Sequence, residues 1–139
     1  GTPPILQFIR ASLAYQLRNE IGFEFIKNRK DELKDLFISE LKKIPNCLIY
    51  GNQEASNIGI VSFNIKGLSP YDLCNKLSLE DGFQTRAGCS CAGPYGHDLL
   101  GIEKLDMNNR PGWVRISIHF SQTKEEIMNL VEGIKKAIN

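Results

Sequence analysis

The sequence lacks any long hydrophobic run. Its 139 residues contain no apolar stretch near the ~20 residues that a bilayer-spanning helix requires. The amino-terminal segment GTPPILQFIR also lacks the basic start and the small-residue cleavage site of a signal peptide. We therefore expect a cytoplasmic protein that has no membrane partner.

An excess of charge of one sign is also lacking. The formal net charge is +1, acidic and basic residues are interleaved, and no low-complexity tract interrupts the chain. This balance gives no electrostatic footprint for nucleic acid, which is therefore not an expected partner. With 42% apolar and 24% charged residues, the composition indicates a globular chain with a single core.

Cysteine is scarce, with four residues in the chain. Cys89 and Cys91 form a C-x-C pair that is too closely spaced for easy bridging, so the pattern does not indicate a secreted disulfide framework, and we expect reduced thiols. Cys47 and Cys74 fall within an expected strand and an expected helix. We interpret both as small hydrophobic residues that fill the core.

Apolar residues recur at helical spacing in four segments. They predict helices over about residues 4–20, from Gly22 to Pro45, from Ser69 to about Leu79, and from a capping box at Thr123-x-x-Glu126 to the end of the chain. The first of these helices has an apolar stripe with no evident partner in the chain, formed by Ile5, Phe8, Ile9, Leu13 and Leu17. We expect this stripe to pack against another molecule or to cause self-association.

Three segments have the character of strands, over residues 47–50, 58–65 and 113–120. In the last one, alternation places Val114, Ile116, Ile118 and Phe120 on one face and Trp113, Arg115, Ser117 and His119 on the other. Helices and strands do not alternate regularly. The predicted fold class is therefore α+β, with a small, mostly antiparallel sheet and helices packed on one face.

The stretch TRAGCSCAGPYGH, residues 85–97, concentrates the reactive side chains. Cys89 and Cys91, together with His97 and His119, provide the ligand types that zinc prefers, but a second paired knuckle is missing. A metal site is therefore the minor reading and no metal is expected, although a stand-alone metal- or thiol-binding module that uses Cys89 and Cys91 stays open as an alternative.

A second reading of this stretch is nucleophilic chemistry. A nearby cation such as Arg86 and exposed backbone amides stabilise a thiolate, which is a better nucleophile than a thiol. Arg115, on the strand face away from the core, has two readings: an exposed salt bridge, or a bidentate clamp for a carboxylate.

The motif from Arg86 to Pro94, RAGCSCAGP, is followed about twenty residues later by WVRISI around Arg115. Together they resemble the carboxyl-terminal domain of class V aminotransferases, pyridoxal-phosphate enzymes that include cysteine desulfurases and selenocysteine lyases. The pattern R-x-G-x-x-C-A-x-P is typical of SufS-like desulfurases. The GTPP segment and the helices after it resemble the family's GTPN segment, so the resemblance covers nearly the whole chain.

The resemblance implies roles for four residues. Cys91 matches the catalytic cysteine, and Arg115 matches the arginine that holds the substrate's α-carboxylate. Arg86 matches an arginine that lines the same site and is taken as substrate-binding. Thr2 matches the threonine that reaches the cofactor phosphate of the neighbouring subunit. The expected reaction is desulfuration of cysteine to alanine with a persulfide on Cys91. Transamination or another lyase reaction of the same family is the alternative.

The family's Schiff-base lysine follows a histidine, and no lysine of this chain has that context. The resemblance therefore implies a fragment of a longer, homodimeric enzyme. In this reading, residues 1–20 are a connecting helix and residues 21–139 are the small domain. The parent would use pyridoxal 5′-phosphate, an amino-acid substrate and a sulfur-acceptor protein. We expect the fragment alone to be inactive and to bind no cofactor covalently.

Overall fold

The computed structural model describes residues 1–91, 93–102 and 110–138. The elements follow the chain in this order: α1 (Ile5–Ile21), α2 (Phe23–Leu41), β1 (Cys47–Ile49), β2 (Ile60–Ile65), α3 (Pro70–Asp81), β3 (Arg86–Gly88), α4 (Gly93–Leu100), β4 (Trp113–Ser117) and α5 (Lys124–Ile138). The predicted α+β class is confirmed. β3 and α4 were not predicted, because both lie in the stretch that was interpreted as a glycine-rich loop.

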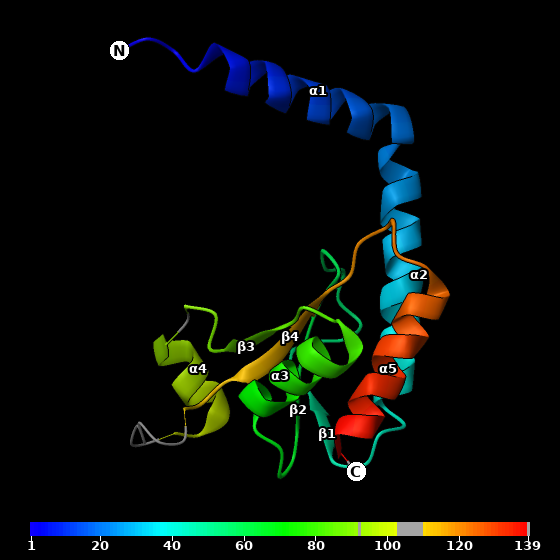
Figure 1. Cartoon of the computed structure of the whole chain (residues 1–139), viewed down its shortest axis with the longest axis vertical. Helices are drawn as coiled ribbons and strands as arrows, with labels where there is room; N and C mark the ends of the chain where they lie inside the picture. The colour runs from blue at the N-terminus through cyan, green and yellow to red at the C-terminus, as the bar shows by residue number, and fades with distance from the viewer. Residues whose placement is uncertain (92, 103–109, 139) are drawn as a thin grey trace.

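The strands form one antiparallel sheet with the order β1-β2-β4-β3. Figure 1 shows α2 and α5 side by side on one side of this sheet and α4 on the other side. The core lies between the sheet and the helices α2, α3 and α5. The prediction of helices on one face is therefore confirmed for α2, α3 and α5. The short helix α4 covers one end of the opposite face, which we call the open face.

The sequence pattern explains the core. Val61, Phe63 and Ile65 alternate along β2 and are buried, as predicted. The apolar stripe of α5 is buried at Ile127, Leu130, Val131 and Ile134. In the last turn, Ile138 is 39% exposed. The α5 capping box also forms: Thr123 Oγ1 accepts from the backbone N–H of Glu126 at 3.1 Å.

All three predicted strands are shorter than the sequence pattern implied. β1 ends at Ile49, one residue before its predicted end. β2 begins at Ile60 because Gly59 has a φ of +87°, outside the extended region. β4 ends at Ser117 because the chain turns soon afterwards: the backbone N–H of Gln122 donates to the carbonyl of His119 at 3.1 Å. Ser69, where the third helix was expected to begin, is the residue that precedes α3, and its side chain makes no capping hydrogen bond.

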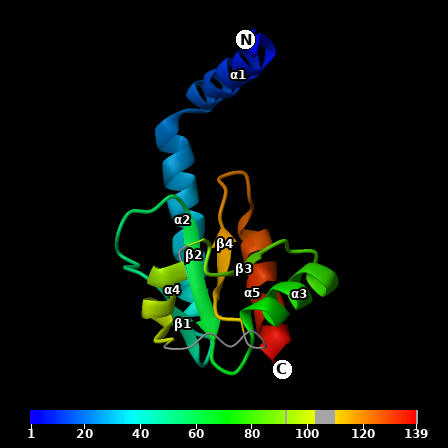
Figure 2. The ribbon, with the colours of Figure 1, turned by 90° about the vertical axis from the view of Figure 1, so that its left-hand side faces the viewer.

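The helix α1 projects away from the rest of the chain. Figures 1 and 2 show a sharp turn between α1 and α2. The residue between the two helices is Gly22, whose φ is +93°. None of the residues of α1 is buried, and Ile5, Leu6 and Phe8 are each more than 60% exposed. Among the residues that the structure describes, its apolar stripe has no partner that buries it, as predicted. Within the described ranges, none of the helices combines the length and the apolar character needed to cross a membrane.

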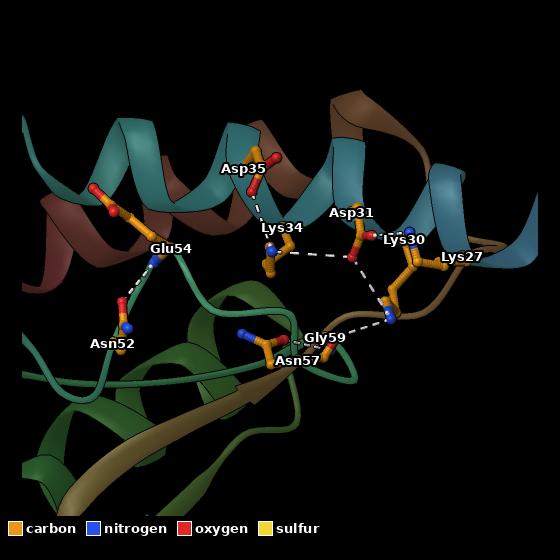
Figure 3. A network of polar contacts seen from close by, with 9 residues as sticks. All are labelled: Lys27, Lys30, Asp31, Lys34, Asp35, Asn52, Glu54, Asn57 and Gly59. Atoms are coloured by element: carbon orange, nitrogen blue, oxygen red, sulfur yellow. Dashed lines mark hydrogen bonds and ion pairs between the residues drawn. The ribbon is translucent and has the colours of Figure 1, made fainter.

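A polar network joins α2 to the loop before β2, as Figure 3 shows. Lys30 Nζ donates to the carbonyl of Asn57 at 2.9 Å, and the Asn57 side chain accepts from the backbone N–H of Gly59 at 2.7 Å. Lys34 is only 6% exposed and lies 3.3 Å from an Asp35 carboxylate oxygen. The carbonyl of Gly59 accepts from the backbone N–H of Ile118 at 2.7 Å. The network therefore fixes one end of the sheet.

Candidate active site

Strand β3 places Arg86 directly opposite Arg115 of β4. In an antiparallel pair, residues directly opposite each other project to the same face of the sheet. Trp113 lies two residues before Arg115 and therefore shares that face, which is the open face. The structure thus brings together the two arginines that the sequence analysis assigned to substrate binding.

The Arg115 guanidinium is half-buried and incompletely paired. Its Nε is buried and has no hydrogen-bond partner among the described residues. Neither Arg115 nor Arg86 forms an ion pair with a carboxylate in the described part of the chain. Like charges directly opposite each other destabilise a sheet, and a buried donor without a partner has a further cost. An anion bound between the two arginines would offset the repulsion and would accept from the unpaired Nε–H. A carboxylate fits the planar fork of a guanidinium.

Cys91 lies in a tight turn between β3 and α4 and is exposed. Ser90 and Cys91 both have a left-handed backbone, with φ values of 51° and 63°. This conformation costs of order 1–3 kcal/mol per residue outside glycine and is found at functional sites more often than elsewhere. Gly88, the last residue of β3, pairs with Trp113, which is two residues before Arg115. The chain that carries Cys91 therefore leaves β3 at that end of the sheet.

Cys89 differs from Cys91 in its surroundings. It is half-buried, and its Sγ donates to the carbonyl of Pro111 at 3.5 Å. It also packs against α4: a Cβ added to Gly96 would lie 3.2 Å from that sulfur. Of the two cysteines in the motif, Cys91 is therefore the more exposed, and an exposed thiol is the more accessible nucleophile.

The zinc reading is not supported by the positions of its ligands. His97 lies on α4, near the Cys91 turn, whereas His119 lies beyond the opposite end of β4 and bonds to Ser121 at 2.8 Å. Within the ranges that the structure describes, no group of three or more His, Cys, Asp or Glu side chains could hold a metal ion.

Cys47 and Cys74 pack against the core, in agreement with their interpretation as fillers. Burial raises the pKa of the Cys47 thiol to about 11. Burial also raises the pKa of Cys74, against the smaller opposite effect of a hydrogen bond with Thr85. Both thiols are therefore protonated at neutral pH and are poor nucleophiles.

Thr2 does not join the arginines. It is exposed and precedes α1, which is 17 residues or roughly 25 Å long and leads away from the sheet. Thr2 therefore lies apart from the two arginines of its own chain.

Two elements of the site were missed in the sequence. The first is β3, three residues long and too short for an alternation pattern. The second is α4, whose Gly93-Pro94 start was a detectable signal, since proline is favoured in the first turn of a helix. The close approach of Gly88 and Gly112 was not foreseen either: a Cβ on Gly112 would lie 2.5 Å from the Gly88 Cα.

The comparisons with known proteins agree with this geometry. Residues 1–130 match the family model described as aminotransferase class V. The chain therefore belongs to the class V aminotransferase family. It is similar to a cysteine desulfurase of Haloferax volcanii, with 31% identity over 137 residues, which is 99% of this chain and 30% of that protein. The chain thus spans about a third or less of the length of the curated relatives it matches.

Solved structures share the fold of this chain. The apo structure of a cysteine desulfurase from Thermococcus onnurineus NA1 matches with a TM-score of 0.83 and 28% identity, covering 98% of this chain and 32% of that one. A cysteine desulfurase from Escherichia coli matches with a TM-score of 0.84 at 23% identity over 99% of this chain and 31% of that one, and it supports the fold.

Proposed function

We propose that this chain is part of a pyridoxal-phosphate-dependent cysteine desulfurase and contributes the substrate-binding arginines and the sulfur-accepting thiol. The observation that carries the proposal is the pairing of Arg86 with Arg115 on the open face, next to the turn that exposes Cys91. The cysteine desulfurases of Haloferax volcanii and Thermococcus onnurineus NA1, to which the chain is similar, support the same reaction.

Arg115 binds the α-carboxylate of the amino-acid substrate. Its half-buried guanidinium is held by β4 between β2 and β3, so the fork is oriented before substrate arrives. Arg86, exposed on the edge strand β3, adds a second positive charge on the same side. An arrangement of two guanidiniums selects substrates with a free carboxylate over neutral thiols.

Cys91 accepts the sulfur. The Cys91 thiolate attacks the substrate sulfur, so an S–S bond forms while the substrate's C–S bond breaks. The electron pair of the broken bond stays on carbon, which takes up a proton to give the methyl group of alanine. The exposed position of Cys91 also lets the persulfide pass to a second protein, and we propose a sulfur-acceptor protein as the partner.

Pyridoxal phosphate, when bound, would withdraw electrons from the substrate's α-carbon. This chain's residues fit the substrate side of such a site. The orphaned Nε of Arg115 is a donor suited to a carboxylate, and the exposed Thr2 hydroxyl is suited to a phosphate of a neighbouring subunit. No lysine of the sequence follows a histidine, so the residues that would hold the ring belong elsewhere in the parent protein.

The division into a connecting helix, residues 1–20, and a small domain, residues 21–139, is part of the proposal. It is supported by the projection of α1 from the remaining elements. A homodimeric parent accounts for both the exposed apolar surface of α1 and the distant position of Thr2. We place the parent in the cytoplasm.

The experiment is to supply the parent protein and its Cys91→Ser variant with cysteine and to measure alanine release. The proposal predicts release by the parent, a loss of at least about 100-fold in the variant, and a persulfide on Cys91 by mass spectrometry. Cys47→Ser, a change of the same kind at a half-buried filler, is the matched control and retains activity. Equal release by the parent and Cys91→Ser would refute the role of Cys91.

The 139-residue chain by itself is expected to form no covalent complex with the cofactor and to release no alanine from cysteine. A new absorbance band of bound cofactor in the purified chain would contradict this. If the parent exchanges amino groups between cysteine and a keto acid without releasing sulfur, transamination is its reaction. Stoichiometric zinc in the purified chain would instead favour the metal- or thiol-binding module.

A further inference from the structure

The turn that exposes Cys91 is flanked by contacts of Cys89. On one side, Cys89 Sγ donates to the carbonyl of Pro111 at 3.5 Å. On the other side, it lies against Gly96 of α4, where an added Cβ would be 3.1 Å from the Cys89 Cβ and 3.2 Å from its Sγ. A single side chain therefore contacts both the segment before β4 and the helix that follows the turn.

The segment that Cys89 contacts is itself held firmly. Tyr71 of α3 donates from its hydroxyl to the Pro111 carbonyl at 3.4 Å, and Asn64 of β2 donates from Nδ2 to the Gly112 carbonyl at 2.8 Å. Gly112 also lies against the backbone of Gly88. Tyr71 thus shares the Pro111 carbonyl with Cys89, and Asn64 holds the next residue, so side chains from two further elements fix the segment that accepts the Cys89 thiol.

The turn needs such support because its conformation is unfavourable by itself. Ser90 and Cys91 have φ values of 51° and 63°, and left-handed residues other than glycine persist where the surrounding structure determines them. α4 is only eight residues long, so it has little stability of its own. Its buried contact is Gly96, which sits over Cys89 and Trp113.

We propose that Cys89 is a positioning residue for Cys91: its half-buried side chain joins the Pro111 carbonyl to Gly96 of α4 and thereby fixes the turn that carries the reactive thiol. It is not a second sulfur carrier, because its half-buried sulfur lies between the Pro111 carbonyl and α4, while Cys91 is exposed. The catalytic consequence rests on the desulfurase function proposed above, whereas the structural consequence does not.

The structural part is tested on the 139-residue chain by hydrogen exchange of the α4 amides. In Cys89→Ala, the loss of the contact raises their exchange rates roughly fivefold, as expected for one net hydrogen bond. Cys89→Ser keeps a donor at the same place and restores most of the protection. Cys47→Ala, the same change at a cysteine packed in the core, leaves α4 protection relative to the other helices unchanged. Unchanged α4 exchange in Cys89→Ala, or equal loosening in Cys47→Ala, would overturn the proposal.

The catalytic part is tested on the parent protein with cysteine. Cys89→Ala lowers kcat roughly tenfold while KM stays near that of the parent, because the arginines that bind substrate are untouched. Cys89→Ser recovers most of kcat. A persulfide on Cys89 during turnover, or a change confined to KM, would contradict the positioning role. If the parent does not desulfurate cysteine, the proposed function fails, and the exchange measurement still decides the role of Cys89.

Discussion

Arg86 and Arg115 are direct cross-strand partners at the exposed edge of the sheet, and neither has a carboxylate partner among the described residues. A sheet gains nothing from two facing guanidiniums, since like charges directly opposite are destabilising. The pairing is therefore better explained by what the two residues bind than by what they contribute to folding.

Removing one of the two charges is expected to stabilise the chain. Arg86→Gln raises the free energy of unfolding by about 0.2–1 kcal/mol at low ionic strength, because it relieves the repulsion with Arg115. The gain shrinks as added salt screens the pair. Denaturant unfolding at low and high salt measures both effects. Arg10→Gln removes a charge from the exposed α1 and should give no such gain; an equal gain would contradict the explanation.

The contact between Gly88 and Gly112 should tolerate no side chain. In Gly112→Ala, the new Cβ would meet the Gly88 Cα at 2.5 Å, so β3 and β4 must separate. We expect a loss of more than about 2 kcal/mol of unfolding free energy, measured by denaturant unfolding. Gly93→Ala is the matched control, since no atom lies within 4 Å of its added Cβ. If both changes cost the same, the close approach is not what excludes a side chain.

The exposed surface of α1 should cause self-association of the 139-residue chain. Phe8 and Leu13 are 61% and 58% exposed, on a helix with no buried residue. Replacing both with Glu should shift the chain toward a monomer in light scattering after size exclusion, because the apolar patch is broken. Leu79→Glu, at an 86% exposed site on α3, should not change the assembly. A wild-type chain that stays monomeric at high concentration would be evidence against this role of α1.

Stability should fall at alkaline pH through Cys47. Burial raises the pKa of its thiol to about 11, above the value of 9.0 expected when it is exposed. The unfolded chain therefore loses this proton first, so the contribution is complete below about pH 9 and is lost as the pH rises toward 11. Because the side chain is only half-buried, the loss is on the order of 1 kcal/mol. Denaturant unfolding at pH 8 and pH 10 measures the fall in the free energy of unfolding between the two pH values. This fall should be smaller in Cys47→Val than in the wild type. In Cys91→Ala, where the thiol removed is exposed, the fall should equal that of the wild type.

Periodicity in the sequence determined the large elements of this protein. The apolar stripes of α2 and α5, the alternation in β2 and β4 and the capping box before α5 were all predicted, because each repeats over several residues. The motif around Cys91 and the segment around Arg115 also indicated the family, which the comparisons confirm.

Only the tertiary structure decided how the site is assembled. Strand β3 is three residues long and exists through its pairing with β4, so no local pattern could predict that Arg86 faces Arg115. The difference in burial between Cys89 and Cys91 likewise depends on contacts of Cys89 with Pro111 and Gly96. Pro111 is 22 residues away in the sequence, and Gly96 lies on α4, which no periodic pattern indicated. The apolar face of a helix or strand is specified locally, by residues that repeat along one segment. Cross-strand pairs, close backbone contacts and the burial of one cysteine beside an exposed one arise only when separate segments pack together.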